Sequence, residues 1–333
     1  MRRAPWLCML ALTALAAGCG EREETVEPGT PEPFELLLDY FPNADHAGIY
    51  AAQADDQFEE LGLDVEIRAP ADPAAPIREV AAGRVDLAVS YEPEVFRARA
   101  QGLPVVAVGA LVQRPLDSII SLPEGGVARP EDLAGKRLGT AGIDYQSAFL
   151  QTILEEAGVD PASVEEVNVG FNLTPALLTG RVDAVLGAFW NYEGVDLRLR
   201  GKDPRIIKVD DAGVPDYDEL VLVANEEAIE NEGDRISAFI AGLAAGTAEL
   251  ERNPDAAVDA LLEANPDLDP ELQREVVAVT SPLFLPPSGE PYGYQDPAQW
   301  DEFARFMQQR GLLESPPDPG ATFTNELLPG EGL

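Results

Sequence analysis

The stretch GRVDLAVS at residues 83–90 returns as GRVDAVLG at residues 180–187, and the fold prediction rests on this repeat. In each copy we expect the glycine to end a helix and the apolar residues after the aspartate to form a buried strand. The copies lie about a hundred residues apart, which predicts two similar lobes. Ligands of open α/β sheets bind at the carboxyl ends of the strands. The residues after each copy are therefore the first place to look for a site.

Strands and helices alternate around both copies. Around the first copy, strands are predicted at residues 34–38, 64–68, 85–90 and 105–112, and helices at 47–61, 76–82 and 93–101. Around the second copy, strands are predicted at residues 137–140, 166–169 and 182–188, and helices at 146–157 and 174–178. This alternation is typical of mostly parallel sheets. The predicted class is α/β, with two lobes that each contain a mostly parallel sheet flanked by helices.

The chain is expected to pass between the lobes twice, near residues 117–121 and near residues 219–223. The second lobe is then an insertion in the first. Two crossing strands form a hinge, and hinges of this kind close clefts around small ligands. The expected boundaries are 34–118 plus 222–325 for the first lobe and 119–221 for the second.

The first 33 residues have the composition of a targeting segment and a tether. A short basic start precedes an apolar stretch that is too short to span a bilayer, which predicts a signal peptide at residues 1–18. Cys19 follows at once, and we expect it to be lipidated, although ordinary cleavage beside an unmodified cysteine is the alternative. Residues 19–33 then form a flexible, charged tether. Cys19 would be the only cysteine of the mature chain, which excludes a disulfide within the fold.

The chain is strongly acidic, with a formal net charge of −37. Removal of the signal peptide would leave 21 basic residues against 60 acidic ones, or −39. Nucleic acid is a poor partner for such a chain, because phosphate neutralisation needs Lys and Arg. The acid excess is otherwise explained by a solvated surface.

Several longer stretches carry a family resemblance. They are LDYFPN at 38–43, DHAGIY at 45–50, GLDVEI at 62–67, GAFWNYE at 187–193 and GVPDYDEL at 213–220. The chain resembles a type II solute-binding protein of an ABC importer, and is most similar to the binding proteins for thiamine pyrimidine precursors. It also resembles the fungal enzymes that make the same pyrimidine. The resemblance implies an extracytoplasmic, lipid-anchored monomer that binds an aminopyrimidine and delivers it to a permease with its ATPase subunits.

Three positions argue against the enzyme. The lysine that holds pyridoxal phosphate in the fungal enzymes corresponds to Ser90, and their histidine to Glu94. Their cysteine cluster falls on Val221–Val223. We therefore expect no catalytic residue, no cofactor and no metal site. Another flat heterocycle such as riboflavin remains the alternative ligand.

The first lobe supplies four expected ligand contacts. Asp39 and Tyr40 end the first strand, where a tyrosine face could stack on a flat ring. Tyr91 ends the strand of the first repeat. His46 is the only histidine, and a contact with backbone at the start of a helix would explain it as well as a ligand contact does.

The second lobe supplies the other four. Trp190 and Tyr192 follow the second repeat, where alternation on an extended segment would place both on one face, although a core position would explain either. Glu193 could accept hydrogen bonds from the amine and protonated ring nitrogen of an aminopyrimidine, and a helix-cap role would explain it equally well. Tyr145 follows Asp144 in a loop that holds phosphate in the related enzymes. Asp144 would repel phosphate, which favours a neutral or cationic ligand.

Overall fold

The computed structural model of the protein describes residues 30–286, 289–315 and 319–330. The predicted signal peptide, the predicted lipidation site Cys19 and most of the predicted tether lie outside these residues. The first strand, β1, spans Glu32–Leu37 and begins within the last two residues assigned to the tether.

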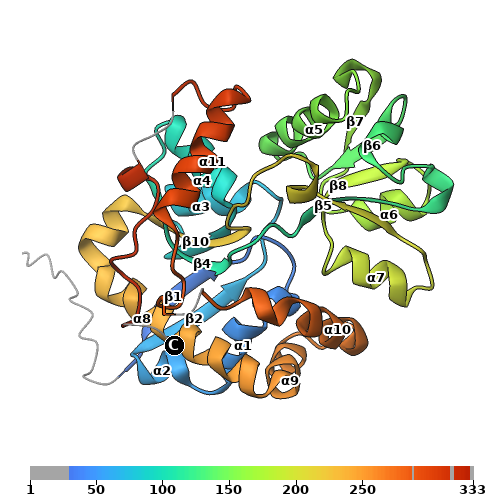
Figure 1. Ribbon diagram of the computed structural model, residues 1–333. Helices are drawn as coiled ribbons and strands as arrows, with labels where there is room; N and C mark the ends of the chain where they lie inside the picture. Colours follow the sequence, from blue (N-terminus) through green and yellow to red (C-terminus); the bar gives the residue numbers. More distant parts are fainter. Residues whose placement is uncertain (1–29, 287–288, 316–318, 331–333) are drawn as a thin grey trace, which may run out of the picture. The chain divides into compact units, whose positions relative to one another are not determined.

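Two five-stranded sheets form the frame of Pro31–Leu333, one in each lobe (Figure 1). The first-lobe sheet has the order β2-β1-β3-β10-β4 and the second-lobe sheet the order β7-β6-β8-β5-β9. In both sheets one strand, β10 or β5, runs antiparallel to the other four. The predicted α/β class with mostly parallel sheets is therefore confirmed. The remaining strands are β2 (Leu63–Arg68), β3 (Leu87–Ser90), β4 (Val105–Val112), β5 (Asp117–Ser121), β6 (Arg137–Thr140), β7 (Glu165–Asn168), β8 (Ala184–Phe189), β9 (Arg205–Lys208) and β10 (Leu220–Asn225).

The two copies of Gly-Arg-Val-Asp occupy equivalent places, just before the middle strands β3 and β8. Both glycines have positive φ, 63° at Gly83 and 68° at Gly180, as a helix end requires. The backbone N–H of Asp86 donates to the carbonyl of Glu35, whose own N–H donates to the Asp86 carboxylate at 2.6 Å. Asp183 makes the same reciprocal pair with Arg137, at 2.8 and 2.9 Å. The repeat therefore ties the middle strand of each sheet to its neighbour.

The two crossings between the sheets lie side by side and are joined by one carboxylate. The chain leaves β4 for β5, and returns from β9 to β10. Oε2 of Glu219 accepts hydrogen bonds from the backbone N–H groups of Leu116 and Asp117, at 2.7 and 2.8 Å, and from the hydroxyl of Tyr217. This buried contact forms the two-crossover hinge. The expected lobe boundaries, 118/119 and 221/222, fall inside the strands β5 and β10.

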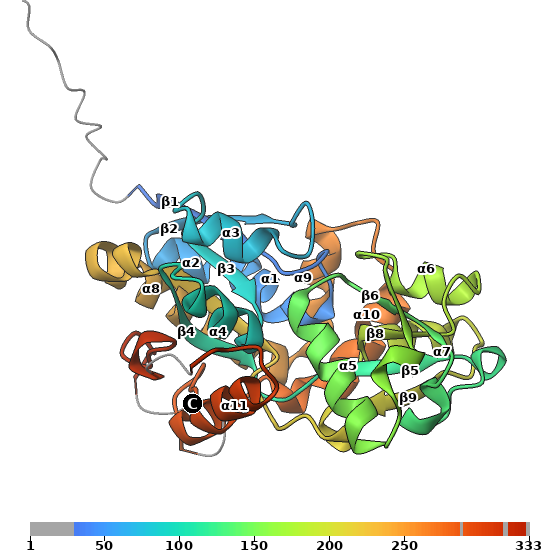
Figure 2. The ribbon, with the colours of Figure 1, turned by 90° about the horizontal axis from the view of Figure 1, so that it is seen from above.

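Helices cover both faces of each sheet (Figures 1 and 2). In the first lobe, α3 and α4 pack on β3, β10 and β4, while α2 and α8 pack against the sheet from the other side. In the second lobe, α5 lies opposite α6 and α7. The helices are α1 (Ala47–Ala54), α2 (Gln57–Glu60), α3 (Ala75–Ala81), α4 (Glu92–Ala100), α5 (Asp144–Glu156), α6 (Leu173–Leu178), α7 (Glu193–Leu199), α8 (Glu226–Arg252), α9 (Pro254–Ala264), α10 (Pro270–Thr280) and α11 (Pro297–Gln309).

Two elements differ from the prediction. The helix expected at residues 47–61 is broken after Ala54, because Asp56 adopts a left-handed conformation with φ of 55°. Aspartate is a poor helix former, and Asp55 and Asp56 stand together at the break. The short edge strand β9 was not predicted at all. None of the helices in the three described ranges combines the length and apolar character needed to cross a membrane.

Candidate functional site

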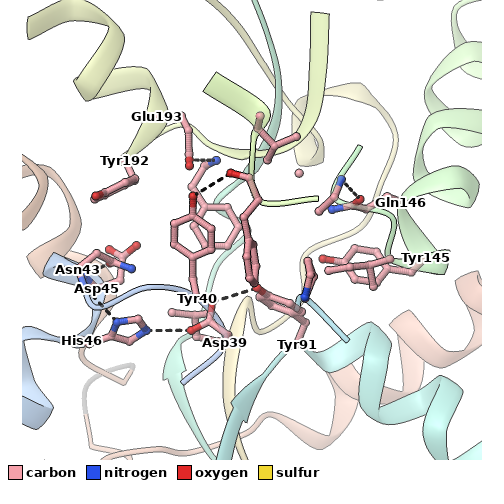
Figure 3. Close-up of a pocket in the computed structure, with 18 residues that line it drawn as sticks. Asp39, Tyr40, Asn43, Asp45, His46, Tyr91, Tyr145, Gln146, Tyr192 and Glu193 are labelled. Atoms are coloured by element: carbon pink, nitrogen blue, oxygen red, sulfur yellow. Dashed lines mark hydrogen bonds and ion pairs between the residues drawn. The ribbon is translucent and has the colours of Figure 1, made fainter. Parts of the chain in front are cut away.

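A cavity lies between the lobes, at the carboxyl ends of β1, β3 and β8 (Figure 3). About 570 Å³ of space without protein atoms lies in and in front of this cavity, open solvent included. Aromatic and acidic side chains dominate the lining, and no lysine or arginine of the described chain takes part in it. The lining residues are Asp39, Tyr40, Asn43, Asp45, His46, Pro73, Tyr91, Ala141, Ile143, Tyr145, Gln146, Phe171, Leu173, Gly187, Phe189, Tyr192, Glu193 and Leu220.

Asp39 is held by two other residues of the first lobe. Its Oδ1 lies 2.8 Å from Nε2 of His46, and its Oδ2 accepts a 2.9 Å hydrogen bond from the hydroxyl of Tyr91. The backbone N–H of Asn43 donates to Nδ1 of His46 at 3.3 Å, so Nε2 is the nitrogen that donates to Asp39. All of these side chains are buried. The network fixes the floor of the cavity in one arrangement (Figure 3).

Glu193 begins α7 and brings a buried carboxyl group to the opposite wall. Its Oε2 accepts a 2.8 Å hydrogen bond from the backbone N–H of Phe189. Its other oxygen has no hydrogen bond from another residue of the described chain. Burial raises the pKa of this carboxyl to about 7, against the lowering effect of the Phe189 N–H and its own N–H. Glu193 therefore changes its protonation state near neutral pH.

Gln146, on α5, lines the cavity beside the backbone of β8. The backbone N–H of Ala141 donates to its Oε1 at 2.9 Å. The nearby Gly187 has φ of 93°, and a Cβ atom there would lie 2.2 Å from Nε2 of Gln146. The N–H of Gly187 donates to Oδ1 of Asp117 at 2.8 Å. Glycine at this position makes room for the amide of Gln146.

A buried set of hydrogen bonds joins the lobes beside the cavity. Nδ2 of Asn191, in the second lobe, donates to Oδ1 of Asp45 and to Oγ1 of Thr280, both at 2.7 Å. Asp45 and Thr280 belong to the first lobe, and all three residues are buried. Burial raises the pKa of Asp45 to about 7, although its hydrogen bonds with Asn191 and Thr280 lower it. Asp45 is therefore a second acid that titrates near neutrality.

Aromatic rings from both lobes meet at the mouth of the cavity. The rings of Tyr40 and Phe171 meet edge to face with centroids 4.9 Å apart, and the hydroxyl of Tyr40 lies 3.4 Å from the Phe171 carbonyl. Phe41, which is 50% exposed, packs on Phe171 at 5.3 Å. On the inner side, Tyr91 lies edge to face with Tyr145 and with Phe189.

The structure brings together all but one of the ligand contacts predicted from the sequence. Asp39, Tyr40, His46, Tyr91, Tyr145, Tyr192 and Glu193 all line the cavity, and Trp190 does not. The indole N–H of Trp190 donates to the carbonyl of Pro115, and the Lys208 ammonium lies 3.9 Å from its ring centroid. The alternation argument fails here because β8 ends at Phe189 and the chain turns before α7 begins.

The sequence prediction missed other lining residues, chiefly Gln146, Phe171, Phe189 and Asp45. Asn43 also caps the short helical turn that follows it, where it accepts a hydrogen bond from the N–H of Asp45. The strand end at Phe189 was a usable signal for that residue. Gln146 and Phe171 lie in segments whose approach to the cavity depends on how the lobes meet. Among the described residues, no group of three or more His, Cys, Asp or Glu could hold a metal ion.

Solved structures with the same architecture define the class of fold. The periplasmic aliphatic sulphonate-binding protein SsuA from Escherichia coli superposes with a TM-score of 0.66 over 91% of this chain and 96% of its own, at 18% identity. The ligand-binding component of an ABC-type import system from Staphylococcus aureus gives a TM-score of 0.69 over 89% and 97%, at 16% identity. The fold is that of a two-lobed solute-binding protein, as predicted.

Sequence comparison narrows this class to a family. Residues 43–257 match the family described as NMT1/THI5 like, and the chain belongs to that family. It is 38% identical to a formylaminopyrimidine-binding protein from Halalkalibacterium halodurans, over 86% of this chain and 87% of that protein. More distant relatives include a 4-amino-5-hydroxymethyl-2-methylpyrimidine phosphate synthase from Legionella pneumophila, at 26% identity over 88% and 92%. A riboflavin-binding protein from Chloroflexus aurantiacus is 28% identical over 97% and 96%.

Proposed function

We propose that the protein is an extracytoplasmic solute-binding protein that captures a thiamine-related aminopyrimidine and delivers it to an ABC permease. The observation that carries the proposal is Glu193, a buried carboxyl group with one oxygen left for a ligand in an aromatic cavity between two lobes. The family and the relative named for formylaminopyrimidine binding support the same ligand class.

The chemistry of Glu193 suits an aminopyrimidine. The exocyclic amine of such a ring donates a hydrogen bond, and the adjacent ring nitrogen either accepts one or, when protonated, donates one. A carboxyl group whose pKa lies at about 7 can pair with either form of the ring. A neutral Glu193 with a neutral ring holds the same number of protons as an ionised Glu193 with a protonated ring. The hydrogen-bonded pair of Glu193 and the ligand is then stable across neutral pH.

Aromatic side chains supply the rest of the binding energy. A flat heterocycle is favoured by stacking or edge contacts with rings, each worth about 0.5–1.5 kcal/mol beyond the area buried. Tyr40 enters the cavity from the first lobe, and Phe189 and Tyr192 from the second. A ligand that touches both lobes stabilises the arrangement in which they meet. Binding then closes the hinge at β5 and β10.

We propose that the protein is not an enzyme of pyrimidine synthesis. Ser90 replaces the lysine that holds pyridoxal phosphate in the related enzymes, and none of the described lining residues is a lysine or arginine that could pair with the phosphate. Incubation with pyridoxal phosphate should give no Schiff-base absorbance. An absorbance that reduction with borohydride makes permanent would restore the enzyme as a candidate.

The predicted signal peptide and Cys19 support a location outside the cytoplasm with a lipid anchor. Retention at the cell membrane would keep it close to its permease and ATPase partners, and we expect it to act as a monomer. Mass spectrometry of the mature amino terminus tests this part. A terminal cysteine carrying acyl chains is the expected result, and a free thiol or another terminus contradicts it.

A thermal-shift panel tests the ligand class. Aminopyrimidines should raise the melting temperature of the purified protein, while riboflavin and an alkanesulfonate should not. The riboflavin arm is included because one relative is a riboflavin-binding protein. A shift with riboflavin alone would replace the aminopyrimidine, and no shift with any pyrimidine would remove this ligand class from the proposal.

A further inference from the structure

The side-chain amide of Gln146 is held in one orientation by the backbone. Its Oε1 accepts the hydrogen bond from Ala141 N–H, and turning the amide over would set an NH₂ group against that N–H. The nitrogen must therefore be on the other side, where it approaches Gly187. Gln146 is 2% exposed, so little of this group reaches solvent.

The Nε2 group of Gln146 has no hydrogen-bond acceptor within the described part of the chain. Its residue lines the cavity, and in Figure 3 it lies on the wall across from Glu193. A donor that gains no partner in a closed site is left unsatisfied, which disfavours a ligand without an acceptor at this place. A ligand atom that accepts this hydrogen bond would satisfy it. The carboxyl groups that line the cavity, those of Asp39, Asp45 and Glu193, offer oxygens, whereas Gln146 offers an amide donor without a partner.

We infer that Gln146 selects ligands that carry a neutral hydrogen-bond acceptor, such as an amide or formyl carbonyl, opposite the edge that pairs with Glu193. This inference rests on the aminopyrimidine function proposed above and adds a specificity-determining residue to it. A phosphate would also accept the bond, but it would enter a cavity whose described walls carry three carboxyl groups and no lysine or arginine. The carbonyl acceptor must therefore be uncharged.

Two ligands that differ in the acceptor test the inference. The first is 4-amino-5-(formylaminomethyl)-2-methylpyrimidine, and the second is 4-amino-2,5-dimethylpyrimidine, which keeps the ring and amine but lacks the carbonyl. Calorimetric titration of both into the wild-type protein, Gln146→Met and Gln146→Glu gives six dissociation constants. Gln146→Glu keeps an oxygen for the Ala141 N–H and replaces only the free donor. Thermal unfolding of each variant shows that it is folded.

The wild-type protein should bind the formyl ligand more tightly than the dimethyl ligand. Gln146→Met should lower the affinity for the formyl ligand about tenfold or more, as expected for the loss of a hydrogen bond to a buried group. Gln146→Glu should lower this affinity further. The affinity for the dimethyl ligand should change by less than about threefold in Gln146→Met. Equal losses for both ligands, or no loss for either, would overturn the role of Gln146. Failure of both ligands to bind the wild-type protein would instead overturn the proposed function, and the inference with it.

Discussion

Two polar side chains in the cavity are positioned in the same way but offer opposite groups. Glu193 gives one oxygen to the N–H of Phe189, and Gln146 gives its oxygen to the N–H of Ala141. Each backbone N–H fixes which atom of the side chain is left for the ligand. Glu193 presents an oxygen and Gln146 an NH₂ group. An amide and a carboxyl group of similar shape are therefore not interchangeable at either position.

Glu193→Gln should weaken aminopyrimidine binding by about tenfold or more. The Phe189 N–H will retain the amide oxygen, so an NH₂ group will face the amine of the ligand and an acceptor will be lost. Asp196→Asn is the matched control, because it removes an acidic group from the same helix. Asp196 pairs with Arg200 and does not line the cavity. Calorimetric affinities decide the outcome. Equal affinity in wild type and Glu193→Gln would remove Glu193 from the binding site.

Among the single residues of the site, the sequence predicted those that directly follow a strand. It missed those whose position depends on the geometry of a turn. Glu193 and Tyr192 were predicted because they follow the second repeat, and both line the cavity. Trp190 was predicted by the same reasoning and lies elsewhere, because the strand ends one residue before it. No sequence pattern marked Gln146, since its role depends on a φ of 93° at Gly187, forty-one residues away in the sequence.

Strand β8 carries a steric requirement at Gly187, beside the cavity. Gly187→Ala should abolish the fit of Gln146, because its Cβ atom would lie 2.2 Å from Nε2, and a positive φ disfavours alanine as well. Ligand affinity should fall by at least tenfold. Gly180→Ala is the control, since Gly180 also has positive φ but no atom lies within 4 Å of its Cβ position. We expect Gly180→Ala to lose about as much stability as Gly187→Ala but to keep its ligand affinity. Unchanged ligand affinity in Gly187→Ala would refute the steric account.

The elements themselves were largely predictable, because local patterns specify them. The repeated tetrapeptide marks a helix end and a strand start in both lobes, and the bonds of Asp86 and Asp183 explain why the same residues occur twice. Helix α1 was predicted too long, since the apolar spacing continues through a break that Asp56 causes. The edge strand β9 is half-exposed and only four residues long, so its sequence carries little apolar pattern.

Across the whole molecule, closure depends on contacts between the lobes at the edge of the cavity. Asn191→Ala should weaken ligand binding about tenfold without touching the ligand, because it removes two buried bonds from the second lobe to Asp45 and Thr280. Asn231→Ala is the control, since its amide bonds only the Glu227 carbonyl of its own exposed helix segment. Affinity by calorimetry is the readout. An unchanged affinity in Asn191→Ala would mean that these bonds are equally strong in the open and closed arrangements.

The buried acids predict how stability depends on pH. Burial raises the pKa values of Asp45, Glu193, Asp218 and Glu219 to about 7, so between about pH 4 and 7 the folded protein holds protons that the unfolded chain releases. Their contribution to stability is therefore complete below about pH 4 and falls as the pH rises to 7. The pKa of Asp183 is lowered by Arg137 and acts in the opposite sense, at lower pH.

Urea unfolding at pH 5.5 and pH 7.5 should therefore give a smaller free energy of unfolding at the higher pH. Each proton released changes the slope by about 1.4 kcal/mol per pH unit. Glu219→Gln should flatten the dependence, because it removes one of the titrating groups from the hinge. A stability that rises from pH 5.5 to 7.5 would contradict the burial of these acids.

The central claim is that the cavity between the lobes binds an aminopyrimidine through Glu193. Calorimetric titration of 4-amino-5-hydroxymethyl-2-methylpyrimidine into the purified protein tests it most directly. We predict saturable binding of one ligand per chain, with a micromolar or tighter dissociation constant, and a loss of at least tenfold in Glu193→Gln. Absence of binding to the wild-type protein, or equal binding to both proteins, would contradict the claim.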